Sequence, residues 1–163
     1  MIDCPVSNKM FYQLHPEQQR SSEFTHMRYT AATGNPTEFR GRRFELRQHL
    51  YSGPRQVELF IVVTMYNETQ DLLARTLIGI FENINYMEIA DNPKWGRGSW
   101  RKIVVCIVSD GAKKINSGSR ALLAGLGVFQ DGVSSEFVNG EKVAAHIYEV
   151  GFSFNHFYNE VLC

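Results

Sequence analysis

An unbroken apolar run that stops at a polar turn limits the folds open to this chain more than any other stretch. The run is Phe60–Val63, within the segment ELFIVVTMYNE. Because β-branched residues dominate it without a polar interruption, it predicts a strand covered on both faces, as in a parallel α/β sheet. Thr64, Tyr66 and Glu68 follow at the carboxyl end of this strand, where α/β proteins hold their ligands. These three side chains are therefore candidates for ligand binding.

The chain after this strand alternates between helical and strand patterns. The predicted elements are a strand over residues 56–64, a helix over 71–85, a strand over 103–108, a helix over 119–126 and a strand over 143–148. The Asn139-Gly140 pair before the last strand indicates a tight turn. Three strands joined by helical crossovers make half of a doubly wound sheet. The predicted fold class is therefore α/β, with a mostly parallel sheet.

The residues before the first core strand carry weaker patterns. Pro5, Pro16 and a polar run predict an irregular, exposed lead-in over residues 1–22. Apolar residues alternate with polar ones from Phe44 to Leu50, which is typical of a short half-buried strand.

Composition excludes several classes of protein. The chain has 163 residues, enough for one domain, and its 44% hydrophobic and 21% charged residues are typical of a globular protein. Its 17 basic and 17 acidic residues balance, so bulk charge gives no reason to expect a nucleic-acid partner. The cysteines Cys4, Cys106 and Cys163 have no zinc-site spacing and fit a reduced, cytosolic compartment. The first residues lack the pattern of a signal peptide, and no apolar run approaches the ~20 residues of a membrane span.

Acidic residues close both of the first two predicted strands. Glu68 and Asp110 would meet at one sheet edge, where carboxylates accept hydrogen bonds from a base or a ribose. Tyr66 offers a ring for stacking on a base, and Lys113 and Lys114 could meet phosphate. The alternative interpretation is that all of these side chains are ordinary turn and helix-start residues. The pattern alone does not favour either interpretation.

Familiar catalytic motifs are absent from this sequence. There is no GxGxxG after the first strand and no GxxxxGK[ST], which argues against a classical NAD site and a P-loop. Ser109 lacks the GxSxG of a nucleophile elbow, and His146 falls within a strand pattern that favours a structural role.

Five longer motifs carry a resemblance to a known family. The chain resembles the fungal chitin synthases across about residues 2–149, in that family's order and spacing. The matching segments are THMRYTAAT (Thr25–Thr33), ELFIVVTMYNE (Glu58–Glu68), WRKIVVCIVSDGAKKIN (Trp100–Asn116), LGVFQDG (Leu126–Gly132) and AHIYE (Ala145–Glu149).

The resemblance implies a fold, an activity and a location. It implies part of a Rossmann-like GT-A glycosyltransferase domain on the cytosolic face of the plasma membrane, anchored by helices that lie downstream in the family. The family is processive and inverting, and transfers N-acetylglucosamine from UDP-N-acetylglucosamine to a growing β-1,4 chitin chain for the cell wall and septum. Mg²⁺ or Mn²⁺ bridges the diphosphate in the complete enzyme. The resemblance leaves open whether the protein forms a homodimer.

The resemblance also implies site residues and domain boundaries. Thr64, Tyr66, Glu68 and Asp110 match the family's uridine pocket, and Lys114 matches a lysine near the nucleotide. The expected divisions are the N-terminal region over 1–54, the first half of the GT-A domain over 55–149 and a divergent tail over 150–163.

Departures from the family pattern limit what is expected of this chain. Gly34 and Asn35 replace Cys-Asp before Pro36, Ala112 replaces an arginine and Phe129 replaces a tyrosine. The family's DxD, acidic base and QRRRW motifs are not in this sequence, so no catalytic or metal-binding residue is assigned and the isolated chain is expected to be inactive as a polymerase. Two alternatives stay open: a non-catalytic UDP-binding or regulatory fragment, and an unrelated small α/β enzyme.

Overall fold

The strands of this protein form two compact units. The computed structural model describes residues 1–14, 16–44 and 57–151. The antiparallel unit comprises Met1–Ser52 and Leu123–Cys163, and the parallel unit comprises Gly53–Leu122, each named after the pairing of its main strands. Within the described ranges, no helix is both long enough and apolar enough to cross a bilayer.

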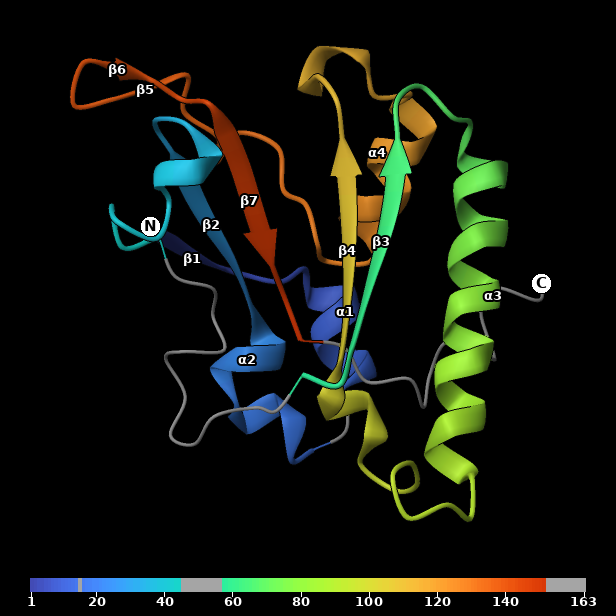
Figure 1. Cartoon of the computed structure of the whole chain (residues 1–163). Coiled ribbons are helices and arrows are strands. Elements are labelled where there is room, and N and C mark those ends of the chain that lie inside the picture. The colour runs from blue at the N-terminus through green and yellow to red at the C-terminus, as the bar shows by residue number, and fades with distance from the viewer. Residues whose placement is uncertain (15, 45–56, 152–163) are drawn as a thin grey trace. The chain divides into compact units, whose positions relative to one another are not determined.

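The parallel unit is a strand–helix–strand motif (Figure 1). Its elements in chain order are β3 (Leu59–Met65), α3 (Gln70–Ile89), the 3₁₀ helix η4 (Ser99–Lys102), β4 (Ile103–Ser109), the 3₁₀ helix η5 (Ala112–Lys114) and the start of α4 (Ser117–Gly125). β3 and β4 pair in parallel, from Leu59 opposite Ile103 to Met65 opposite Ser109. Both predicted core strands and the helix between them are confirmed.

Helix α3 forms because its apolar residues share one face. Leu73, Leu77 and Ile84 are each no more than 3% exposed, and their spacings of four and seven return to the same side of a helix. Thr69 adopts an extended conformation at the N-cap, and Asp71 lies in the first turn, where a carboxylate favours the helix dipole. The helix thus buries one stripe and leaves the other to solvent.

The prediction that the first core strand is covered on both faces is wrong. Phe60 and Val62 are each 53% exposed, while Ile61 and Val63, which point to the opposite face, are partly buried. A continuous apolar run specifies a strand, but whether its second face is covered depends on elements far away in the sequence.

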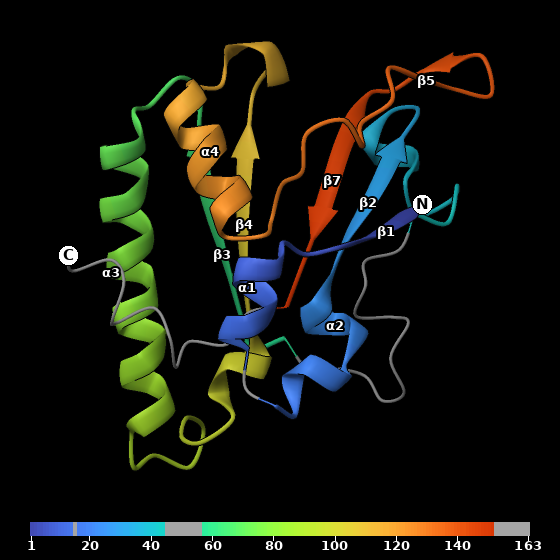
Figure 2. The same ribbon diagram turned by 180° about the vertical axis from the view of Figure 1, so that it is seen from behind.

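The antiparallel unit is built around a central strand, β2. Its elements in chain order are β1 (Ile2–Pro5), α1 (Asn8–Gln13), η1 (Gln18–Arg20), α2 (Ser22–Thr25), β2 (His26–Ala32), η2 (Pro36–Glu38), β5 (Phe137–Val138), β6 (Glu141–Lys142) and β7 (Ala145–Glu149). The sheet order is β1-β2-β7, and both neighbours run antiparallel to β2 (Figure 2). Met27, Tyr29 and Ala32 supply its most deeply buried side chains.

Two predictions for this unit need correction. Residues 1–22 are not an irregular lead-in, because Ile2–Pro5 pairs with β2 and Asn8–Gln13 is helical. The strand predicted over 143–148 forms as β7, but it pairs with β2 rather than extending the parallel pair. Local sequence specifies a strand without specifying its partner. The mixed α/β class is confirmed, whereas a mostly parallel sheet is not what the described residues form.

The remaining local predictions have mixed outcomes. The Asn139-Gly140 turn is confirmed: φ is 51° at Asn139 and 80° at Gly140, as a type I′ hairpin between β5 and β6 requires. The helix predicted over 119–126 is confirmed as α4, which starts two residues earlier at Ser117. Most of the strand predicted from Phe44 to Leu50 lies outside the described residues.

Candidate functional site

The structure places all five candidate residues at one end of the parallel unit. Thr64 lies near the end of β3, and Tyr66 and Glu68 lie in the turn that leads to α3. Asp110 directly follows β4, and Lys114 ends the short helix η5. All five are exposed, so each is accessible to a ligand. This edge is where the carboxyl ends of β3 and β4 meet.

A hydrogen bond joins the turns that follow the two strands. The Lys114 ammonium donates to the Tyr66 hydroxyl oxygen at 2.6 Å. The same nitrogen lies 4.9 Å from the centre of the Tyr66 ring. The cation is therefore closer to the hydroxyl than to the ring, and Tyr66 remains 48% exposed. An aromatic surface and a positive charge are thus side by side at the edge.

The Glu68 carboxylate is bound by amides of its own turn. Its Oε2 accepts the Tyr66 backbone N–H at 2.6 Å. Hydrogen bonds from the backbone amides of Tyr66, then Glu68, then Asn67 lower the pKa of the Glu68 carboxyl below its ordinary value. Glu68 therefore stays ionised at neutral pH, in a fixed orientation and open to solvent.

Asp110 is held against the first turn through its backbone. Its amide N–H donates to the Met65 carbonyl at 3.3 Å, which extends the pairing of β3 and β4 one step beyond Ser109. Gly111 follows with a φ of 95°, a left-handed conformation that favours glycine. The chain turns at this glycine, and Lys114, three residues further on, reaches the Tyr66 hydroxyl. The buried Ser109 hydroxyl has no hydrogen-bond partner within the part of the chain that the structure describes.

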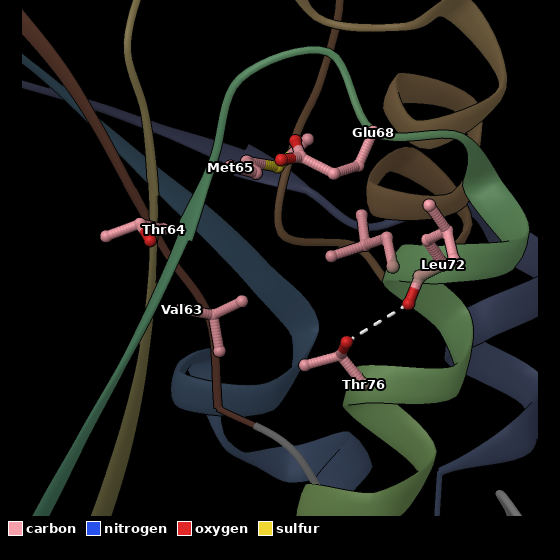
Figure 3. A pocket seen from close by; sticks show the side chains of 7 residues that line it. Val63, Thr64, Met65, Glu68, Leu72 and Thr76 are labelled. Atoms are coloured by element: carbon pink, nitrogen blue, oxygen red, sulfur yellow. Dashed lines mark hydrogen bonds between the residues drawn. The ribbon is translucent and has the colours of Figure 1, made fainter.

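A small hollow lies beside Glu68, between β3 and α3 (Figure 3). Its free space is about 50 Å³, and its lining residues are Val63, Thr64, Met65, Glu68, Leu72, Leu73 and Thr76. Pockets for small-molecule ligands usually measure about 300–1,000 Å³. The hollow is therefore too small for a nucleotide. Figure 3 also shows the Thr64 side chain on the opposite side of β3 from Val63. The candidate site is consequently the open edge rather than the hollow.

Two further residues, which the sequence patterns did not single out, support this edge. The Ser119 hydroxyl donates to the Glu68 carbonyl oxygen at 2.7 Å. The Asn116 side chain accepts the backbone N–H of Gly118 at 2.9 Å and that of Ser119 at 3.4 Å. The local signal for Asn116 is its position before the helix, because asparagine is a preferred N-cap. Nothing local indicates the partner of Ser119.

The edge does not assemble the donors that a hard divalent cation needs. In the described ranges, no three carboxylate, imidazole or thiol side chains gather as metal ligands. Of the two carboxylates near the edge, that of Glu68 is engaged by amides. These residues do not fit a complete Mg²⁺ or Mn²⁺ site.

Comparison with protein families identifies the class. A model described as a chitin synthase-like glycosyltransferase domain matches residues 59–160, which include the candidate edge. The matched residues therefore belong to a glycosyltransferase class of domain. A second model, described as chitin synthase N-terminal, matches residues 1–58. The chain belongs to the chitin synthase family, and the resemblance read from its motifs is confirmed.

Individual relatives agree with this assignment. The chain is 53% identical over 151 residues to chitin synthase A of Ampelomyces quisqualis and 55% identical over 151 residues to chitin synthase C of Aspergillus oryzae. It is 49% identical over 156 residues to chitin synthase 2 of Candida albicans. Each match covers 91% of this chain but only 16–17% of the relative. The chain thus corresponds to a small part of those proteins.

Proposed function

We propose that the open edge of the parallel unit holds the UDP part of UDP-N-acetylglucosamine. The observation that carries this proposal is the position of an exposed tyrosine, two exposed carboxyl residues and a lysine after the carboxyl ends of paired parallel strands. Ligands of open α/β sheets bind at this position. The proposal includes the finer fold assignment: residues 55–149 are the first half of a GT-A domain, residues 1–54 form the N-terminal region and residues 150–163 are a divergent tail.

Each side chain has a role that follows from its chemistry. The exposed ring of Tyr66 stacks on uracil. The carboxylates of Glu68 and Asp110 accept hydrogen bonds from the uracil N–H and the ribose hydroxyls. Lys114 attracts the diphosphate, which competes with the Tyr66 hydroxyl for the ammonium. Thr64 contributes a hydroxyl at the end of β3.

The proposed reaction is the one that the family name describes. N-Acetylglucosamine is transferred from the UDP donor to the growing chitin chain, with inversion, at the cytosolic face of the plasma membrane during cell-wall and septum formation. Mg²⁺ or Mn²⁺ would neutralise the leaving diphosphate. The described residues do not fit such an ion. The contribution of this chain is to bind and orient the nucleotide.

Calorimetric titration of the full chain with UDP tests the proposal. Replacing Lys114 by alanine is expected to weaken UDP binding about tenfold and to leave uridine binding unchanged, since uridine has no phosphate. Lys113→Ala is the matched control, because it removes the same charge from an adjacent exposed residue of η5. The absence of UDP binding by the unaltered chain, or equal losses for the two lysines, would contradict the proposal.

A further inference from the structure

Ser119 is a buried residue whose hydroxyl bonds to a distant part of the chain. Its exposure is 0%, and its hydroxyl donates to the backbone carbonyl of Glu68, a residue 51 positions earlier in the chain. Glu68 itself is exposed. A side chain in the core thus holds the backbone of a surface turn, and that turn carries two of the residues assigned to the nucleotide.

The Asn116 side chain holds the first turn of α4, which contains Ser119. The Asn116 side chain accepts the amides of Gly118 and Ser119, which gives the first turn of the helix a defined position. A methyl group at Gly118 would collide with the side-chain amide of Gln70, the first residue of α3. Glycine at this position therefore leaves room for the Gln70 side-chain amide beside the start of α4.

The turn from Tyr66 to Glu68 is consequently held at two points. The Glu68 carboxylate closes the turn on itself by accepting the Tyr66 amide at 2.6 Å. The Glu68 carbonyl is tied to α4 by Ser119 at 2.7 Å. The first bond sets the direction of the carboxylate relative to the Tyr66 backbone, and the second sets the position of the whole turn relative to the segment that follows β4.

We propose that Ser119 is a positioning residue for nucleotide binding, which it supports through Glu68. The inference rests on the function proposed above. Ser119 is too deeply buried to touch a ligand, so its contribution is to keep the Glu68 carboxylate within reach of the uridine. Losing a neutral hydrogen bond of this kind is expected to weaken UDP binding about three- to tenfold.

The experiment is a UDP titration of the full chain and three variants. Ser119→Ala removes the donor. Ser119→Cys keeps nearly the same volume with a weaker donor, and is expected to give a smaller loss. Ser117→Ala is the matched control, because it makes the same change at an exposed position in the same helical turn, and it is expected to change UDP affinity by less than about twofold.

A double-variant cycle separates positioning from general support of the fold. In a Glu68→Ala background, Ser119→Ala is expected to weaken UDP binding less than it does in the unaltered chain, since the carboxylate that Ser119 positions is absent. Urea unfolding establishes that each variant is folded during the titration, and Ser119→Cys serves if Ser119→Ala does not fold.

The outcomes distinguish the two proposals. If the unaltered chain does not bind UDP, the proposed function fails and this inference fails with it. If the unaltered chain binds UDP and the folded Ser119 variants bind equally well, the inference alone is overturned. An equal loss in both backgrounds also overturns it, because Ser119 would then act independently of Glu68.

Discussion

Tyr29 and Tyr66 show how differently the two units use the same kind of side chain. Tyr29, in the antiparallel unit, is 2% exposed, and its hydroxyl accepts the Ser135 amide at 3.1 Å and lies 2.8 Å from His146 Nδ1. Tyr66, in the parallel unit, is 48% exposed, and its hydroxyl accepts from the exposed Lys114 ammonium. The Tyr29 hydroxyl makes its hydrogen bonds within the fold, whereas the ring of Tyr66 is exposed and accessible to a ligand.

Ionisable groups show the same contrast. In the antiparallel unit, Tyr148 packs against Tyr29 and Phe129, and burial is the main cause that raises the pKa of its phenol. In the parallel unit, amide hydrogen bonds lower the pKa of the Glu68 carboxyl at an exposed turn. Desolvation favours the neutral form in one place, and hydrogen bonding favours the charged form in the other. Burial dominates at Tyr148 in the antiparallel unit, and backbone amides dominate at Glu68, beyond the end of β3.

The largest expected effect is on stability, at Tyr29. Replacing Tyr29 by alanine should lower the free energy of unfolding by about 3–5 kcal/mol, because a buried ring is lost and the Ser135 amide loses its partner. Urea unfolding followed by circular dichroism measures this change. Tyr66→Ala is the control, and it should change the free energy of unfolding by no more than about 0.5 kcal/mol. Equal destabilisation by the two variants would contradict the claim that Tyr29 supports the fold and Tyr66 does not.

The next effect is on ligand affinity, at Tyr66. Tyr66→Ala should weaken UDP binding by about five- to 150-fold, because one base–ring stack contributes about 1–3 kcal/mol. Tyr66→Phe keeps the ring but removes the hydroxyl that accepts from Lys114, so it should bind UDP far better than the alanine variant. Fluorescence or calorimetric titration compares them. An alanine variant that binds as tightly as the unaltered chain would remove Tyr66 from the site.

The smallest effect is on the pH dependence of stability, at Glu68. The folded chain holds the pKa of this carboxyl below its ordinary value, so its contribution to stability is complete above that value. The contribution is lost as the pH falls below about 4.3 and through the folded-state pKa. Glu68→Gln should flatten this part of the profile of unfolding free energy against pH. A profile identical to that of the unaltered chain would show that the amide bonds do not favour the ionised form.

Sequence patterns identified the parallel unit well because its signals are local. Each of its elements is predicted from residues within one segment. These signals are the unbroken apolar run of β3, the helical spacing of Leu73 and Leu77 in α3, and the apolar run of β4. The turn chemistry of Asn139-Gly140 is local in the same way. The five candidate residues follow from these elements, since the carboxyl ends of paired parallel strands share an edge. Their role in binding UDP stays a prediction.

What the patterns missed depends on distant partners. The short strand Ile2–Pro5 has no clear alternation, and it becomes a strand by pairing with β2. β7 has a clear strand pattern, but its choice of β2 as partner is settled by contacts such as Tyr29 opposite Tyr148. The bond from Ser119 to Glu68 is a third case, because its atoms are 51 positions apart. Local propensity carries no information about any of these.

The discontinuity of the antiparallel unit has a consequence for the order of events during synthesis. Its central contact, Tyr29 with His146, joins residues 117 positions apart, while the parallel unit is one uninterrupted segment. A chain emerging from the ribosome presents all of β3, α3 and β4 before β7 exists. During synthesis, β2 can therefore pair only with β1 until β7 has been translated. Closing so long a loop is slow, so assembly of this three-stranded sheet is expected to limit the rate at which the chain folds.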